Sequence, residues 1–365
     1  MILIAGCSKP APQPAQRRAS QTDLGPEPRP VAQPPDPPAE PAVRKQTDGR
    51  PFAATTVDPL GPVALSTDGS RLIAVSNTGR VTMQWSVEGG ALISDHDGPM
   101  PDGTTDADGL TTIDDHLVGW FWSDAQDRRE VVIFKPGEPV KWRLPAMSAL
   151  ASPDATTLAV YTSSHPEPPH GIRLYTWPEL VLDRTLPSKD VTAGLAFGSR
   201  NRLFQGEDFG RLTMWDTATG ARTPLFDSVK PLNATVHRLD VSPDGRRLLV
   251  GSTPYMRGTK DPMLELWATD PPRRLEVFDT KSVMFVAFLD DTTFVHHGFA
   301  PHVPAQVLGL DPTTSEWTIL QTFRDWGPEH VALDRTRRVL YGTSGGNTHV
   351  QCLDLSMRGQ CPDPG

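Results

Sequence analysis

The chain has 365 residues, of which 22% are charged and 7% aromatic, and its formal net charge is −9. The first 50 residues hold seven of the basic and five of the acidic residues, so the remainder carries 28 basic and 39 acidic ones. This acidic balance keeps the protein soluble and argues against nucleic acid as a partner and against binding to an anionic lipid surface. No run of eighteen apolar residues is present to form a membrane-spanning helix.

The chain begins with MILIAGC, residues 1–7. Within it, Ile4-Ala5-Gly6-Cys7 resembles the lipobox of bacterial lipoproteins. That resemblance implies that the Cys7 thiol is diacylated and that Cys7 becomes the new N-terminus. The basic n-region and the apolar h-region of a signal peptide do not precede it, so either the natural start lies upstream of Met1 or the match is accidental.

Residues 8–50 form a proline-rich segment with eleven prolines and no aromatic side chain. Such a composition cannot bury enough apolar surface to offset its conformational entropy. We expect a disordered or polyproline-like linker that ends where the folded domain, residues 51–365, begins.

A short pattern recurs through that domain, and its strongest copy is VSPDGRRLLV, residues 241–250. Proline, aspartate and glycine favour a tight turn, and apolar residues on both sides favour two strands. The first strong apolar residue after each turn marks the copies: Leu72, Leu117, Leu158, Leu203, Leu248, Phe294 and Val339. Their spacings of 45, 41, 45, 45, 46 and 45 residues are typical of four-stranded propeller blades.

A third strand follows the marker in each copy and ends on a large apolar residue. These predicted strands are Val81–Trp85, Glu130–Phe134, Ile172–Tyr175, Leu212–Trp215, Leu264–Trp267, Val307–Leu310 and Val350–Leu353. A fourth strand is predicted after most of them, as at Arg222–Phe226. The sequence therefore predicts an all-β fold, a seven-bladed β-propeller of four-stranded antiparallel blades.

The third strands resemble those of WD-repeat propellers and of the related TolB-type periplasmic propellers. Trp215-Asp216 keeps the Trp-Asp pair, Leu353-Asp354 keeps the aspartate, and Trp85-Ser86 and Trp267-Ala268 keep the tryptophan. The Gly-His element of typical WD repeats is missing. The resemblance implies a fold and no catalytic residues.

Prolines follow Cys361 where the last copy needs its fourth strand. We therefore expect Phe52–Val57 to supply that outer strand by pairing with Val350–Leu355, which would close the ring through both ends of the domain and remove an exposed edge.

Three loops between second and third strands are long and share one face of a propeller. They are Thr162–Gly171, Ser252–Pro262 and Gly298–Pro304, whereas Gly206–Gly210 in the fourth copy is short. Loops on a rigid scaffold often form binding sites, so we predict a protein-binding face, with tolerated insertions as the alternative. The groups it offers are His165, Glu167, His170, Tyr255, Met256, Arg257, Lys260, Phe299 and His302.

Two cysteines, Cys352 and Cys361, remain after Cys7, and an even pair in an oxidising compartment predicts a disulfide.

Neighbouring His296 and His297 should point to opposite faces of a strand, one inside and one outside, so no metal site is expected there. The sequence Gly342-Thr343-Ser344-Gly345-Gly346 matches a nucleophile elbow, but it aligns with a turn rather than with a strand-to-helix junction.

These features predict a non-enzymatic, monomeric protein-interaction scaffold without metal or cofactor, at the bacterial cell envelope, held by a lipid or free in the periplasmic or extracellular space. The alternatives are a hydrolase of the propeller-lactonase type, with carboxylates or a metal at the central channel, and a carbohydrate or small-ligand binder.

Overall fold

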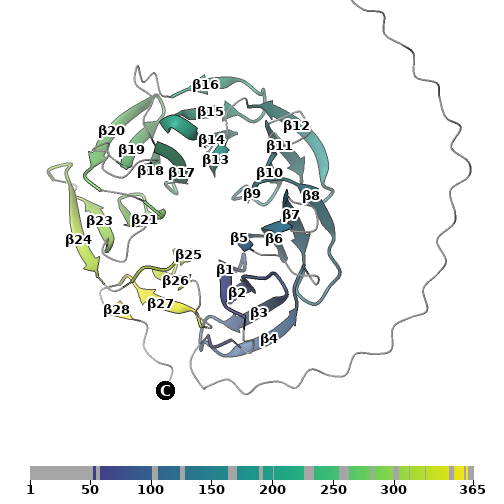
Figure 1. Cartoon of the computed structure of the whole chain (residues 1–365). Helices are drawn as coiled ribbons and strands as arrows, with labels where there is room; N and C mark the ends of the chain where they lie inside the picture. Colours follow the sequence, from purple (N-terminus) through teal and green to yellow (C-terminus); the bar gives the residue numbers. More distant parts are fainter. Residues whose placement is uncertain are drawn as a thin grey trace, which may run out of the picture. The chain divides into compact units, whose positions relative to one another are not determined.

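The computed structural model describes residues 52–54, 58–100, 106–123, 128–162, 171–188, 192–199, 201–225, 234–254, 263–280, 283–298, 304–311, 313–324, 326–344, 349–356 and 359–360. Contacts within the chain divide it into two units, Met1–Val43 and Arg44–Gly365, and all of the described residues belong to the second. In the part described, 28 strands form seven antiparallel sheets of four strands each, which stand around a common centre (Figure 1).

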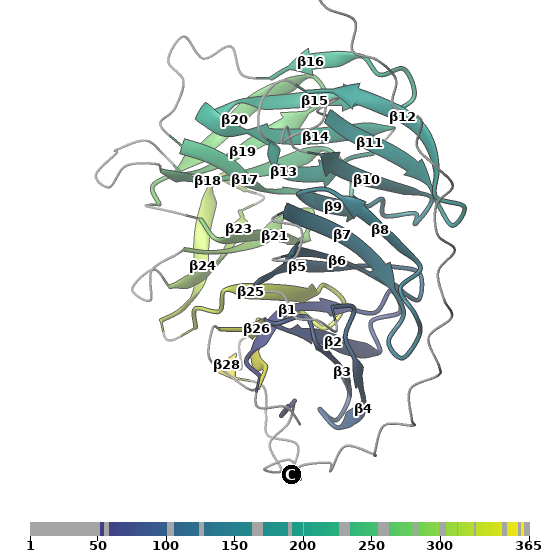
Figure 2. The ribbon, with the colours of Figure 1, turned by 45° about the vertical axis from the view of Figure 1, so that its right-hand side comes forward.

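Each blade runs outward from the centre in chain order, as Figures 1 and 2 show. The innermost strands are β1 (Leu60–Leu65), β5 (Asp106–Ile113), β9 (Ser148–Ala151), β13 (Thr192–Phe197), β17 (Ala234–Val241), β21 (Phe285–Asp290) and β25 (His330–Asp334). The second strands are β2 (Arg71–Ser76), β6 (His116–Ser123), β10 (Thr157–Thr162), β14 (Arg202–Glu207), β18 (Arg247–Pro254), β22 (Thr293–His297) and β26 (Val339–Thr343). A 3₁₀ turn, η1 (Asp208–Gly210), follows β14.

The outer half of each blade has the same plan. The third strands are β3 (Val81–Ser86), β7 (Arg128–Phe134), β11 (Gly171–Thr176), β15 (Leu212–Asp216), β19 (Leu264–Thr269), β23 (Ala305–Leu310) and β27 (Gln351–Asp354). The fourth strands are β4 (Leu92–Asp97), β8 (Trp142–Pro145), β12 (Val181–Pro187), β16 (Arg222–Pro224), β20 (Pro272–Phe278), β24 (Trp317–Phe323) and β28 (Gly359–Gln360). The predicted fold is confirmed, and all seven marker residues lie in second strands.

Every pair of neighbouring blades has its own apolar core. The seven buried clusters lie one at each of the seven seams, so no blade covers both of its faces alone. The marker residues Leu72, Leu158, Leu203, Leu248 and Phe294 have no exposed surface within them. Burial of this apolar surface is the main force that holds the blades in a ring.

The prediction that Phe52–Val57 forms the outer strand of the last blade is wrong. The chain's own β28 pairs with β27, because Gly359 and Gln360 precede the prolines and are free to form a short ladder. The N-terminal segment contributes an isolated bridge, Ala53 to His349, and a hydrogen bond from Val350 N to the carbonyl oxygen of Phe52 at 3.3 Å. Residues 55–57 lie outside the described part of the chain.

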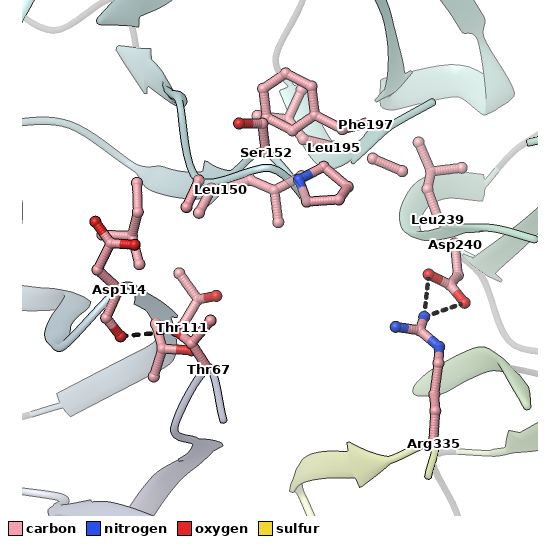
Figure 3. A pocket seen from close by; sticks show the side chains of 16 residues that line it. Thr67, Thr111, Asp114, Leu150, Ser152, Leu195, Phe197, Leu239, Asp240 and Arg335 are labelled. Atoms are coloured by element: carbon pink, nitrogen blue, oxygen red, sulfur yellow. Dashed lines mark hydrogen bonds and ion pairs between the residues drawn. The ribbon is translucent and has the colours of Figure 1, made fainter. Parts of the chain in front are cut away.

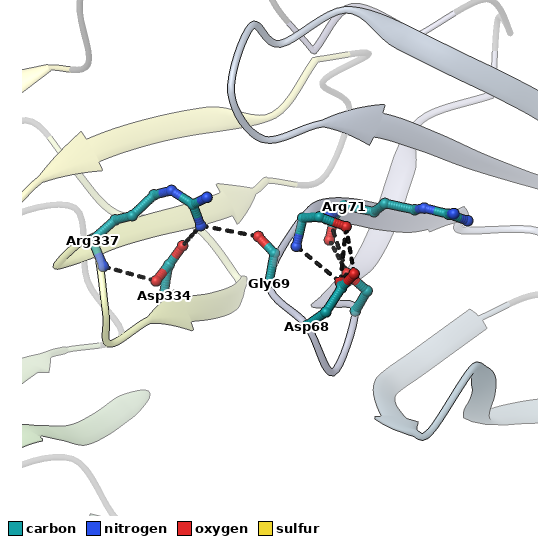
Figure 4. A network of polar contacts seen from close by, with 7 residues as sticks. Asp68, Gly69, Arg71, Asp334 and Arg337 are labelled. Carbon is teal, nitrogen blue, oxygen red and sulfur yellow. Dashed lines mark hydrogen bonds and ion pairs between the residues drawn. The ribbon is translucent and has the colours of Figure 1, made fainter.

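The seam between the last and the first blade is held by side chains. Phe52 packs in one cluster with Leu60 and Trp85 of the first blade and with Tyr341 of the last. Polar contacts cross the same seam, since the Arg337 guanidinium donates to the carbonyl oxygen of Gly69 at 3.0 Å while it pairs with Asp334 (Figure 4). An apolar wedge and an arginine bridge therefore close the ring.

The turns between first and second strands repeat one arrangement in blades one, three and five. A serine hydroxyl donates to the aspartate two residues later at 2.6 Å and accepts from a backbone N–H three residues after that aspartate at 2.9 Å. The residue after the aspartate is left-handed: Gly69 has φ 68°, Gly245 has φ 70°, and Ala155 adopts φ 53° at the same place.

These turns allow a matched prediction. Gly69→Ala should lower the free energy of unfolding by ~1–2 kcal/mol, because a residue with a Cβ is strained at positive φ. No clash adds to this loss, since the nearest atom would lie 3.7 Å from the new Cβ. Gly245→Ala should cost more, since its Cβ would also lie 2.6 Å from the Cβ of Ser199. Gly89→Ala, with open space and no positive φ, is the control in urea denaturation. Equal losses for Gly69→Ala and Gly245→Ala would contradict this account.

Candidate functional site

A cavity of about 300 Å³ lies where the innermost strands end, at the centre of the ring (Figure 3). It is lined from six blades: by the turn after β1, the ends of β5, β9, β13 and β17, and Arg335 just after β25. The repeat creates this cavity, because the innermost strand of each blade ends at the same opening of the ring and is followed there by a turn. The repeated Ser-x-Asp turns form part of its rim.

The rim aspartates of these turns each accept several hydrogen bonds. The pKa of Asp68 falls to about 2 because the Ser66 hydroxyl and the Ser70 N–H donate to its carboxylate. The pKa of Asp154 is lowered for the same reason, by Ser152 first. These carboxylates are therefore anions that hold the turn together, which suits a structural role rather than that of a general acid.

One wall of the cavity carries an ion pair that joins three blades. Arg335 Nη2 donates to both carboxylate oxygens of Asp240, at 3.0 and 2.9 Å, and Arg335 Nε donates to the carbonyl oxygen of Phe288 at 2.9 Å. The Phe288 N–H donates in turn to Asp240 at 2.7 Å. Burial raises the pKa of Asp240, and the guanidinium opposes that shift. The pair thus ties β17, β21 and the turn after β25 together.

Not all of the Arg335 donors are used in this network. In Figure 3 the Nη1 group of Arg335 points toward the cavity, away from Asp240, and the Arg335 side chain is 48% exposed. Half-buried Leu150, Leu195 and Phe197 lie together on a neighbouring part of the cavity, Leu239 lies beside Asp240, and Thr67, Thr111 and Asp114 lie across from Arg335 (Figure 3). The site therefore combines a fixed hydrogen-bond donor with an apolar wall.

Three buried glutamates show how this fold uses carboxylates away from the cavity. Each pairs with an arginine of the fourth strand in its own blade: Glu130 with Arg143 at 3.3 Å, Glu207 with Arg222 at 3.5 Å, and Glu265 with Arg274 at 3.2 Å. Burial raises the pKa of Glu265, against the hydrogen bonds from Trp267 and Arg274. These glutamates hold the fourth strands against their blades.

Across the described ranges, no group of three His, Cys, Asp or Glu residues is placed to hold a metal ion.

Several histidines lie in blades five to seven, at the strand ends away from the cavity. His237 on β17 contacts the Thr235 carbonyl oxygen and the Thr253 hydroxyl, each at 3.1 Å, and burial followed by the charge of Arg238 lowers its pKa to about 4. The pKa values of His297 and His330 are also lowered, by burial first and then by Arg238. These side chains are neutral at pH 7.

The expectation of one inward and one outward histidine at His296 and His297 is wrong. Both are 3% exposed, because the two faces of a blade are each covered by a neighbouring blade. His296 Nε2 lies 3.2 Å from Gln306 Oε1, and His297 Nε2 lies 2.9 Å from the carbonyl oxygen of Pro328. The two rings do point apart, so they do not share a ligand.

The residues of the predicted binding face lie outside the described part of the chain, and so do Cys7 and Cys361. This holds for His165, Glu167, His170, Tyr255, Met256, Arg257, Lys260, Phe299 and His302. Cys352 is disulfide-bonded, and its pairing with Cys361 stays a prediction. Gly342 and Thr343 belong to β26, whose strand ends before Ser344.

Asp240 and Arg335, which face the cavity, were not predicted as site residues. They are 95 positions apart, and no local pattern joins them. One signal was available at Arg335: the turn of the last copy, Arg335-Thr336-Arg337-Arg338, carries three arginines just before its marker residue.

The fold and the seams define a seven-bladed β-propeller, and its structural neighbours are WD40-like. Solved structures with the same architecture include a chain of "Crystal Structure of Mitotic Checkpoint Complex", at TM-score 0.62 and 16% identity over 87% of this chain and 95% of that one. "Crystal structure of RRP9 WD40 repeats" matches at TM-score 0.61 and 11% identity over 84% and 91%. "Structure of U3-55K" matches at 0.59 and 11% over 84% and 93%. No protein-family model and no curated protein matches the sequence.

Proposed function

We propose that this protein is a non-enzymatic scaffold that binds other proteins through the mouths of its propeller ring. The observation that carries the proposal is the central cavity, where half-buried apolar side chains face a fixed arginine donor. Partly covered apolar groups on a rigid frame are what a protein partner covers on binding. The WD40-like architecture of the neighbours supports the same function, and one of them comes from a multiprotein assembly by its title.

The proposal places the scaffold, as a monomer, at the bacterial cell envelope. This location is proposed from the lipobox resemblance of residues 4–7, the proline-rich linker and the likeness of the repeats to TolB-type propellers. A flexible linker of this length would span about 35–40 Å on average, and a polyproline one ~130 Å. Either span would let the ring reach partners near a membrane. Within the described residues, no helix has the length and apolar character needed to cross a membrane.

Site-specific photocross-linking in the native host tests the scaffold function. We expect p-benzoylphenylalanine at exposed Thr67, beside the cavity, or at Tyr255, on the predicted loop face, to give discrete cross-linked proteins. The matched control is exposed Thr223 on the outer strand β16, which should give none. Absence of adducts at both mouths, or equal adducts at Thr223, would contradict the proposal.

Mass spectrometry of the protein extracted from membranes tests the tether separately. We expect a diacylglyceryl group on Cys7, as the lipobox resemblance implies. An unmodified Cys7 in the mature protein would remove the lipid anchor from the proposal and leave the scaffold function to the cross-linking result.

A further inference from the structure

We propose that the central cavity binds an uncharged peptide segment of the partner, with one large apolar side chain against the Leu195–Phe197 wall and a backbone carbonyl that accepts from Arg335 Nη1. This inference rests on the proposed scaffold function and names the chemistry that its cavity recognises.

The size of the cavity limits what it can hold. Its volume of about 300 Å³ lies at the lower end of the range for ligand sites, which is enough for an apolar side chain and the peptide groups beside it. The strand ends that line it leave Leu195, Phe197 and Leu239 half-buried. An apolar group placed among them would remove that remaining surface from water.

The ion pair in the cavity wall favours a neutral group beside Arg335. Arg335 is already paired with Asp240 at 2.9 and 3.0 Å, so the pair has no net charge with which to attract a phosphate or carboxylate. A cation meets a carboxylate at Asp240 that is already neutralised, because Asp240 receives Arg335 and the Phe288 N–H. The donor that points toward the cavity, Arg335 Nη1, suits a carbonyl oxygen.

The same ion pair makes Arg335 a positioned donor rather than a mobile surface side chain. Its Nε and Nη2 groups are held by the carbonyl oxygen of Phe288 and by Asp240, so little rotamer freedom remains for the ligand to remove. Recognition of a carbonyl therefore needs no rearrangement of the blades.

Methyl NMR of the full chain, with labelled leucine methyl groups, tests the inference with small probes. N-acetylphenylalaninamide carries the apolar ring and the carbonyls, toluene lacks the carbonyls, and N-acetylglycinamide lacks the ring. We expect the first probe to shift the Leu195 and Leu239 methyl resonances saturably and more tightly than either fragment. N-acetylphenylalanine, with its carboxylate, and phenethylammonium should bind no more tightly than the amide.

Two variants separate recognition from folding. Thr111→Trp fills the cavity and should abolish the shifts, whereas Thr223→Trp on β16 should leave them unchanged. Arg335→Gln should weaken the amide probe about three- to tenfold, as loss of one hydrogen bond predicts, and leave toluene binding within about twofold. A purely structural role of Arg335 would change both probes equally.

Tighter binding of the carboxylate or ammonium probe, or no shift at the cavity methyls, would overturn the inference. If cross-links form at Thr67 or Tyr255 while no probe enters the cavity, the scaffold function stands and this peptide site falls. If the probes bind and no cross-links form, the cavity chemistry stands and the scaffold function falls.

Discussion

Phe52→Ala is expected to lower the free energy of unfolding by ~3–5 kcal/mol, because it removes a buried aromatic ring from the seam that closes the propeller. Phe52 is 7% exposed. Its ring meets those of Trp85 and Tyr341 edge-on, with centroids 6.5 and 5.6 Å away. The substitution would leave a cavity between the first and last blades, where Trp85 would lose a packing partner.

Urea denaturation followed by tryptophan fluorescence measures this loss. Phe52→Leu should recover part of the stability, since it keeps much of the apolar volume. The matched control is Ile319→Ala on the outer strand β24, where the side chain is 57% exposed and the expected loss is under about 0.5 kcal/mol. A loss at Phe52→Ala no larger than that at Ile319→Ala would show that the seam does not depend on the wedge.

Acidification from about pH 6.5 to pH 4 is expected to lower the free energy of unfolding by ~3 kcal/mol through His296 alone. Burial, with a smaller contribution from His297, lowers the pKa of His296 to about 4, and its hydrogen bond with Gln306 opposes the shift. In the unfolded chain the imidazole regains a pKa near 6.5 and takes up a proton in this window, while the folded protein excludes it. Stability therefore falls with falling pH and levels off, for this group, below about pH 4.

Other histidines act in the same direction and the rim aspartates in a lower window. His237, with a pKa of about 4, adds to the loss between pH 6.5 and 4. The contribution of Asp68, whose pKa is about 2, is present above pH 4 and is lost as the pH falls further. The two kinds of group can thus be told apart by the pH at which stability changes.

His296→Gln isolates the contribution of His296. Glutamine cannot be protonated here and can still donate to Gln306, so the difference in stability between about pH 7 and pH 4 should shrink by ~3 kcal/mol. Urea unfolding midpoints of both proteins across this range give the comparison. An unchanged pH dependence in the variant would assign the acid sensitivity to other groups.

The blade pattern could be predicted from sequence because its causes are local. A turn such as Ser242–Gly245 needs residues that lie next to one another, and the strands around Leu248 and Trp267 need only apolar residues within one blade. The seams follow as well, since strands that are apolar on both faces require a neighbour on each side.

The closure and the cavity could not be predicted in this way. Whether Phe52 forms a strand or a wedge depends on Trp85 and Tyr341, which the sequence separates widely. The burial of both His296 and His297 likewise comes from two neighbouring blades rather than from strand alternation.

The sequence by itself determined the repeat unit, the number of blades and the acidic character of the domain, because turn geometry and apolar patterning act over a few residues. Only the tertiary structure decided how the ring closes and which charges meet at its centre. Asp240 and Arg335 become partners because three blades bring them within hydrogen-bond distance, and a hydrogen bond depends on distance in space rather than on separation along the chain.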